Sequence, residues 1–131
     1  MKKILIVIAD YYKDISSSLL KSAKSNLNNF AVKVIKVPGV FEIPTTISKN
    51  IKKYDAFIAL GCVIKGETPH FDFISKSAIN AIMFLSIINK KPIGNGILTC
   101  LNKKQAIVRA NPRKKNKGGE AANAMISSLK K

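Results

Sequence analysis

The sequence predicts an α/β protein with three layers, in which a four-stranded parallel sheet carries helices on both faces. Four short stretches are rich in β-branched and other apolar residues, and stretches with apolar residues at helical spacing alternate with them. This alternation is typical of parallel strands connected by crossover helices. The first apolar stretch, Ile4–Ile8, contains no polar residue, which indicates a strand buried on both faces.

Turn and helix signals divide the first half of the chain. Pro38 and Gly39 predict a turn after the second strand, and Pro44 suits the first turn of a helix. We therefore expect a strand, a helix, a strand and a short helix at residues 4–8, 15–27, 32–37 and 43–51.

The second half repeats the pattern. Thr68 and Pro69 predict a helix start, with Thr68 as the N-cap and Pro69 as the first helical residue. We expect the third strand to end at Leu60, before Gly61. The expected elements are a strand at 56–60, a helix at 69–89, a strand at 92–99, and helices at 103–110 and 119–129 on either side of a basic loop.

Length and charge limit the possible functions. The 131 residues are enough for a single domain with its own core, which we expect to span residues 1–131. A net charge of +16 favours an anionic partner such as nucleic acid, a membrane surface or a phosphorylated substrate. Arg109 and Arg113 are the only arginines, although proteins that read base edges mostly use arginine.

Other residues indicate the compartment and the absence of metal. Cys62 and Cys100 are too few for a disulfide framework and are expected to be reduced thiols of a cytoplasmic protein. The most apolar stretch, Ala78–Ile88, is shorter than the roughly 20 residues that span a bilayer. One histidine and two distant cysteines lack the spacing of metal ligands, so no metal site is expected.

Ligands of open parallel sheets bind beyond the carboxyl ends of the strands, and several polar residues of this chain lie there. His70, the only histidine, is a candidate general acid or base, and a surface or core role is the alternative. The turn formed by Gly66, Glu67 and Thr68 precedes a helix, so its N–H groups suit an anion, and an ordinary capped turn is the alternative.

Two further segments have a functional and a structural interpretation. Phe41 could stack on a planar ring while Glu42 accepts hydrogen bonds from hydroxyls; alternatively, Phe41 is buried and Glu42 is solvated. Arg109 and the basic run at 113–117 either supply a cation to a phosphate or form a solvated loop.

Five separated motifs together resemble the lumazine synthase family. They occur in the family's order and at comparable spacing, and the resemblance extends from about Lys3 to Leu129. The motifs are Val37–Pro44, Gly61–Asp72, Gly96–Thr99, Gln105–Ala106 with Arg109–Ala110, and Asn116–Gly118.

The resemblance implies a flavodoxin-like sheet and the penultimate step of riboflavin synthesis. The family condenses 5-amino-6-(D-ribitylamino)uracil with 3,4-dihydroxy-2-butanone 4-phosphate and releases phosphate and two waters, without a cofactor or metal. Its members form pentamers whose sites are shared between adjacent subunits, and twelve pentamers can form a sixty-subunit capsid. A homo-oligomer is therefore the expected state, with a pentamer as its basic unit.

Site residues are implied by position. His70 matches the family's proton-transfer histidine, Glu67 and Thr68 match backbone positions that hold the butanone phosphate, and Arg109 matches the arginine that pairs with it. The positions that match contacts to the ribitylaminouracil are Tyr11 (stacking), Asn95 (from the neighbouring subunit), Lys117 (near the heterocycle), Val40, Phe41, Glu42, Cys62, Val63 and Ile64.

Two positions depart from the family pattern, and two rival functions follow from other features. Asn95 stands where many members have Phe, and Leu101 stands where many have an acidic residue. The rivals are a nucleic-acid-binding module, suggested by the charge and a pI of about 10.1, and a catalytically idle shell protein with the same fold. The scattered lysines and the lack of a nucleic-acid motif argue against the first rival.

Overall fold

The computed structural model describes residues 1–131 and contains one sheet of four parallel strands in the order β2-β1-β3-β4. This order matches the first four strands of a flavodoxin-like sheet. The strands are β1 (Lys3–Ala9), β2 (Ala31–Val37), β3 (Ala56–Ile64) and β4 (Ile93–Cys100).

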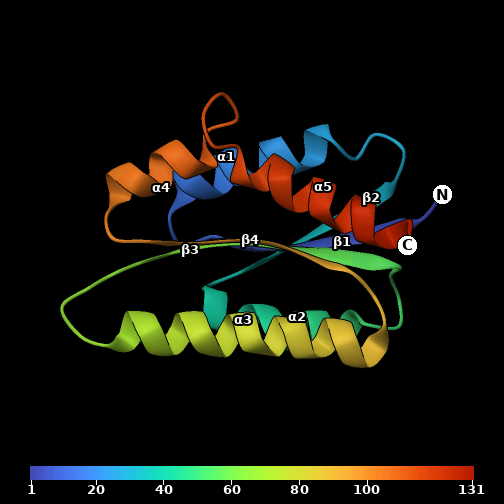
Figure 1. The fold of residues 1–131 in the computed structure, drawn as a ribbon, viewed down its shortest axis with the longest axis horizontal. Coiled ribbons are helices and arrows are strands. Elements are labelled where there is room, and N and C mark those ends of the chain that lie inside the picture. Colours follow the sequence, from blue (N-terminus) through green and yellow to red (C-terminus); the bar gives the residue numbers. More distant parts are fainter.

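Helices cover both faces of the sheet, which confirms the predicted three-layer sandwich (Figure 1). One face carries α1 (Lys13–Ser25), α4 (Lys103–Ala110) and α5 (Lys117–Leu129). The other face carries α2 (Ile43–Asn50), which follows the single 3₁₀ turn η1 (Val40–Glu42), and α3 (His70–Asn89).

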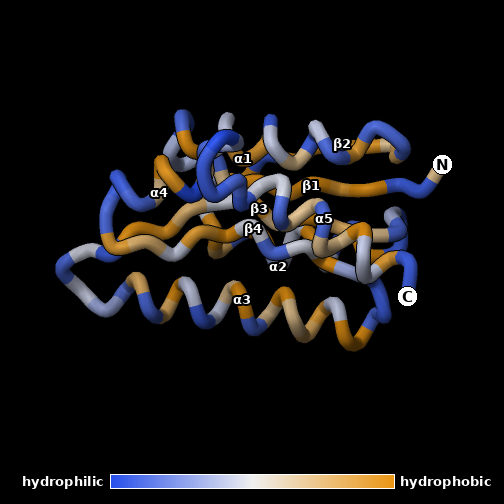
Figure 2. Tube along the Cα trace, turned by 45° about the horizontal axis from the view of Figure 1, so that its top comes forward, coloured by the Kyte–Doolittle hydropathy of each residue, from blue (hydrophilic) through white to orange (hydrophobic).

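The uninterrupted apolar run of β1 is explained by two cores, one on each face of the sheet. Successive side chains of a strand point to opposite faces. Ile4, Ile6 and Ile8 therefore join the core under α1, α4 and α5, whereas Leu5 and Val7 join the core under α2 and α3. The hydropathy colouring shows the apolar strands between helices of mixed character (Figure 2).

Several element boundaries differ from those expected. β3 continues through Gly61 to Ile64 because β4 pairs with it as far as Cys100, so the expected end at Leu60 is wrong. α3 begins at His70 with Pro69 as its N-cap, one residue later than expected. α5 begins at Lys117, before the expected start at 119.

Two glycines allow α5 to pack closely on its neighbours. A Cβ on Gly94 of β4 would collide with the backbone carbonyl of Ala121 in α5. A Cβ on Gly118 would collide with the carbonyl of Leu19 in α1. These close approaches fix the start of α5, including Lys117, against the edge of the sheet.

One face of α3 is apolar and uncovered in the single chain. By length and composition, this 20-residue helix could cross a membrane. Its most apolar 18-residue window has a mean hydropathy of 1.5, and 17% of the residues in that window are buried. The sequence analysis considered only the apolar stretch 78–88, which is too short to cross a membrane, whereas the helix runs from His70 to Asn89. A single helix of this kind is weak evidence for a membrane. Its exposed large apolar residues are Phe73, Met83, Phe84, Ile87 and Ile88.

Candidate active site

The carboxyl ends of β1, β2 and β3 meet the start of α3 at one end of the sheet (Figure 1). The connections change direction between β1 and β3, and ligands of doubly wound sheets bind at such a point. A cavity of about 310 Å³ lies there. Its lining residues are Tyr11, Tyr12, Gly39, Val40, Cys62, Val63, Ile64, His70 and Ile74.

A second cavity of about 520 Å³ adjoins the first and adds Phe41 and Glu42 to the lining. Phe41 is 60% exposed, so the alternative of a buried phenylalanine is wrong. The Glu42 carboxylate lies over Gly39, because a Cβ built on Gly39 would be 3.2 Å from Glu42 Oε1. A planar ligand beside Phe41 would therefore have a carboxylate within reach.

His70 lines both cavities. It is the first residue of α3, and its backbone N–H donates to Thr68 Oγ1 at 3.4 Å. The side chain is exposed, so its imidazole can exchange protons with a ligand on either side. Glu67 and Thr68 lie in the exposed loop before it and line neither cavity.

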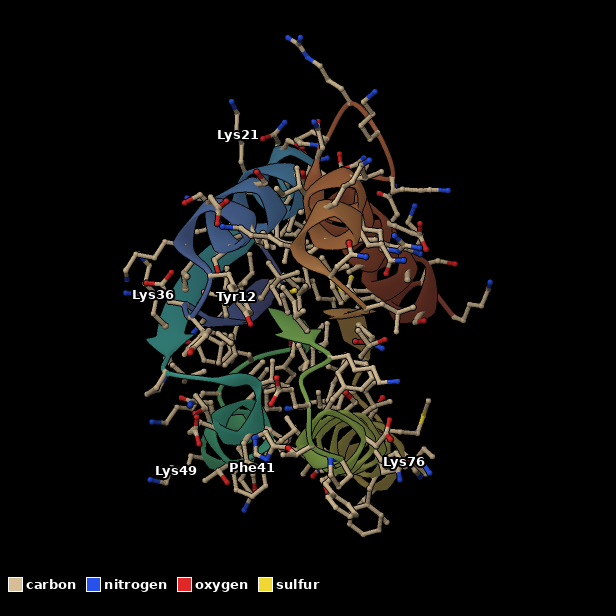
Figure 3. All side chains as sticks on the ribbon, turned by 90° about the vertical axis from the view of Figure 1, so that its left-hand side faces the viewer. Tyr12, Lys21, Lys36, Phe41, Lys49 and Lys76 are labelled. Atoms are coloured by element: carbon tan, nitrogen blue, oxygen red, sulfur yellow. The ribbon has the colours of Figure 1, made fainter.

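Tyr12 is a cavity residue that the sequence analysis missed. Its ring packs edge-on against Tyr11, with 4.9 Å between the ring centroids and 82° between the planes. Burial raises the pKa of its hydroxyl, with smaller contributions from Cys62 and Tyr11. Figure 3 looks onto this end of the molecule and shows Tyr12 beside the strand ends and Phe41 farther out, by α2.

Two other lining residues were also missed. Ile74 follows His70 by one helical turn, and this spacing places both residues on one face of α3. The spacing alone could have indicated that Ile74 lies beside His70 in the site. Gly39 was considered only as a turn residue, although the close Glu42 side chain leaves little room for a larger residue there.

Cys62 forms an apolar wall of the first cavity. Burial, followed by the neighbouring Cys100, raises the pKa of its thiol to about 12. Burial also raises the pKa of Cys100. Both cysteines are free thiols, as expected, and a thiol that stays protonated at neutral pH is a poor nucleophile.

Three of the expected site residues lie elsewhere, at the free edge of β4. Asn95, Arg109 and Lys117 line a cavity of about 230 Å³ together with Glu120. Arg109 Nη1 donates to the Gln105 carbonyl at 3.3 Å, and Lys117 Nζ lies 3.1 Å from Glu120 Oε1.

This edge cavity shares no lining residue with the two cavities at His70. The single chain thus presents two separate groups of residues. One group has aromatic rings, a carboxylate and an imidazole, which suit a planar polar ligand and proton transfer. The other has two cations, which suit a phosphate.

Comparisons with known proteins identify the family of this chain. The model of a family described as 6,7-dimethyl-8-ribityllumazine synthase matches residues 1–131. A protein of that name from Zymomonas mobilis is 44% identical, with 100% of this chain and 98% of the relative covered. One from Bartonella tribocorum is 45% identical, with 96% and 87% covered. From this match over its whole length, the chain belongs to the 6,7-dimethyl-8-ribityllumazine synthase family.

Proposed function

We propose that this protein catalyses the condensation of 5-amino-6-(D-ribitylamino)uracil with 3,4-dihydroxy-2-butanone 4-phosphate in riboflavin biosynthesis. Family membership and relatives more than 40% identical support this activity. The structural observation that carries it is the position of His70, which lines both the Tyr11 cavity and the Phe41–Glu42 cavity. One proton-transfer group then faces both cavities of the proposed uracil site.

The residues divide the work of the reaction between binding and proton transfer. The amine of the uracil attacks the ketone and forms an imine with loss of water; phosphate is then eliminated, and ring closure releases the second water. Rings at Tyr11 and Phe41 hold the planar pyrimidine, and Glu42 accepts hydrogen bonds from the ribityl hydroxyls. His70 moves protons during imine formation and phosphate elimination. Holding both substrates in reacting geometry supplies much of the acceleration.

Some substrate contacts require a second copy of the chain in this proposal, namely Arg109 for the phosphate and Asn95 and Lys117 for the uracil. Arg109, Lys117 and Asn95 line a cavity apart from His70, so a neighbouring subunit brings them to the site. The uncovered apolar face of α3 supports association, because such patches are typical of protein interfaces. We infer a cytoplasmic homo-oligomer of single-domain subunits, built from pentamers that can form a sixty-subunit capsid.

Incubation of the purified protein with both substrates tests the activity, with product formation followed by lumazine absorbance. We expect turnover by the native protein and a loss of about 100-fold or more in His70→Ala, the usual size of a general acid–base contribution. Light scattering of the same samples shows whether the variant keeps its assembly. No product from the assembled native protein would refute the proposed function.

A further inference from the structure

A further cavity lies at the opposite end of the sheet from His70. It has a volume of about 630 Å³, within the range of small-molecule sites. It lies where β1 and β2 begin and where α2 connects to β3. We call it the lysine groove, and its lining residues are Lys3, Ala31, Val32, Lys33, Lys52, Lys53 and Tyr54.

The charge of the lysine groove is not neutralised within the chain. The salt bridges of the structure involve Lys13, Lys103 and Lys117, and none involves a lysine of the groove. The nearest carboxylate in sequence, Asp55, accepts a hydrogen bond from the backbone N–H of Lys3 at 2.7 Å. Four ammonium groups around one cavity favour a ligand with several negative charges.

The backbone that carries these lysines is held in place. Lys53 N–H donates to the Asn50 carbonyl at 3.0 Å in the turn after α2. Lys91, from the segment before β4, donates its Nζ to the Ile51 carbonyl at 2.7 Å. On the other side, Ala31 N–H donates to the Lys2 carbonyl at 2.9 Å. The two walls of the groove are therefore anchored independently of any ligand.

The other lining residues of the lysine groove are two small apolar residues and an aromatic ring. Ala31, Val32 and Tyr54 are its non-lysine residues. The Tyr54 ring is half-buried and packs edge-on against Phe57, with 6.1 Å between centroids. Phe57 is fully buried in the core, so the position of the Tyr54 ring is constrained. A fixed aromatic ring offers a stacking surface for a planar base.

We propose that the lysine groove binds a nucleoside di- or triphosphate, with the base against Tyr54 and the phosphates among Lys3, Lys33, Lys52 and Lys53. A ligand with both a planar ring and several negative charges uses the whole lining, whereas inorganic phosphate uses only the lysines. A volume of about 630 Å³ suits one nucleotide better than a continuous nucleic-acid strand. This site shares no lining residue with the candidate active site.

Calorimetric titration of the assembled protein with ADP, pyrophosphate and adenosine tests the proposal. We expect Lys33→Ala/Lys53→Ala to weaken ADP and pyrophosphate binding by about tenfold or more, because each removed lysine contributed a charge-assisted contact. The matched control, Lys21→Ala/Lys24→Ala, removes the same charge from exposed positions of α1 and should keep ADP binding within about twofold. Tyr54→Leu should weaken ADP but leave pyrophosphate unchanged.

Lumazine formation separates this proposal from the proposed function. The lysine-groove variants should form product at the native rate, and Arg109→Ala should still bind ADP. The proposal is overturned if ADP does not bind, if both double variants weaken ADP equally, or if Arg109→Ala abolishes ADP binding. Binding of a single-stranded oligonucleotide far tighter than ADP, with the same lysine dependence, would also overturn it and would indicate a nucleic-acid surface.

Discussion

His70 and Arg109 belong to the same chain but line different cavities, His70 at the carboxyl ends of β1 to β3 and Arg109 at the free edge of β4. If a neighbouring subunit supplies Arg109 to each His70, chains defective in either residue should complement each other. We expect His70→Ala and Arg109→Ala to be nearly inactive separately. An equal mixture, unfolded and refolded together, should recover about one quarter of native activity, because one site in four pairs two intact halves. Activity no higher than that of the separate variants would show that both residues act within one subunit.

The Cys62 thiol should resist alkylation in the folded protein. Its pKa of about 12 keeps the reactive thiolate scarce until strongly alkaline pH, and burial limits access. We expect iodoacetamide to modify Cys62 much more slowly than the same residue in urea, as followed by mass spectrometry of digested samples. Rapid modification near pH 8 in the folded state would contradict the assigned environment.

The same thiol should make stability fall at alkaline pH. The folded-state pKa lies above the ordinary value of 9.0, so between about pH 9 and 12 the unfolded chain releases a proton that the folded chain keeps. Deprotonation therefore favours unfolding, and this contribution to stability is present below pH 9 and decreases above it. Urea unfolding at a series of pH values should show a smaller decrease in Cys62→Ala than in the native protein. Equal slopes would contradict the prediction.

Where local signals agreed with the packing, the sequence was a reliable guide to structure. The helix at 103–110 was predicted with the observed bounds, and Asn102 accepts a hydrogen bond from the Gln105 backbone N–H at its start. The boundary of β3 was missed because Gly61 is a local breaker, whereas pairing with β4 carries the strand on to Ile64. Such pairing joins residues far apart in sequence, so no local pattern reveals it.

The candidate site shows the same division. The predicted positions of the strand ends indicated where the site residues would lie. His70, Tyr11 and Glu42 do line cavities at that end of the sheet. Strand order decides which side chains share a cavity. In this sheet β4 is an edge strand, and Arg109 lies beside it, apart from His70. Tyr12 was missed because it follows β1, whereas Cys62 lies near the end of β3. The two residues share a cavity only once these strands pair in the sheet.

Gly94 and Gly66 offer a matched test of the close packing of α5. Gly94→Ala should destabilise the protein by about 1–3 kcal/mol, because the added methyl group meets the Ala121 carbonyl and forces a backbone shift. A Cβ on Gly66 meets nothing within 4 Å, so Gly66→Ala should change stability by less than about 0.5 kcal/mol. Urea denaturation measures both. Equal effects would mean that α5 does not approach β4 as closely as described.

The apolar face of α3 should hold the oligomer together. Phe84 is 62% exposed and Ile87 is 65% exposed in the single chain, and burying a carboxylate in an apolar interface without a partner is costly. We therefore expect Phe84→Asp or Ile87→Asp to reduce the particle mass measured by light scattering while the far-ultraviolet circular dichroism stays native. Ser17→Asp, on an exposed position of α1, adds the same charge outside the α3 face and should leave the mass unchanged. A native mass in both α3 variants would exclude this face from the interface. A different surface of the chain would then have to form the contact that brings Arg109 of one subunit to His70 of its neighbour.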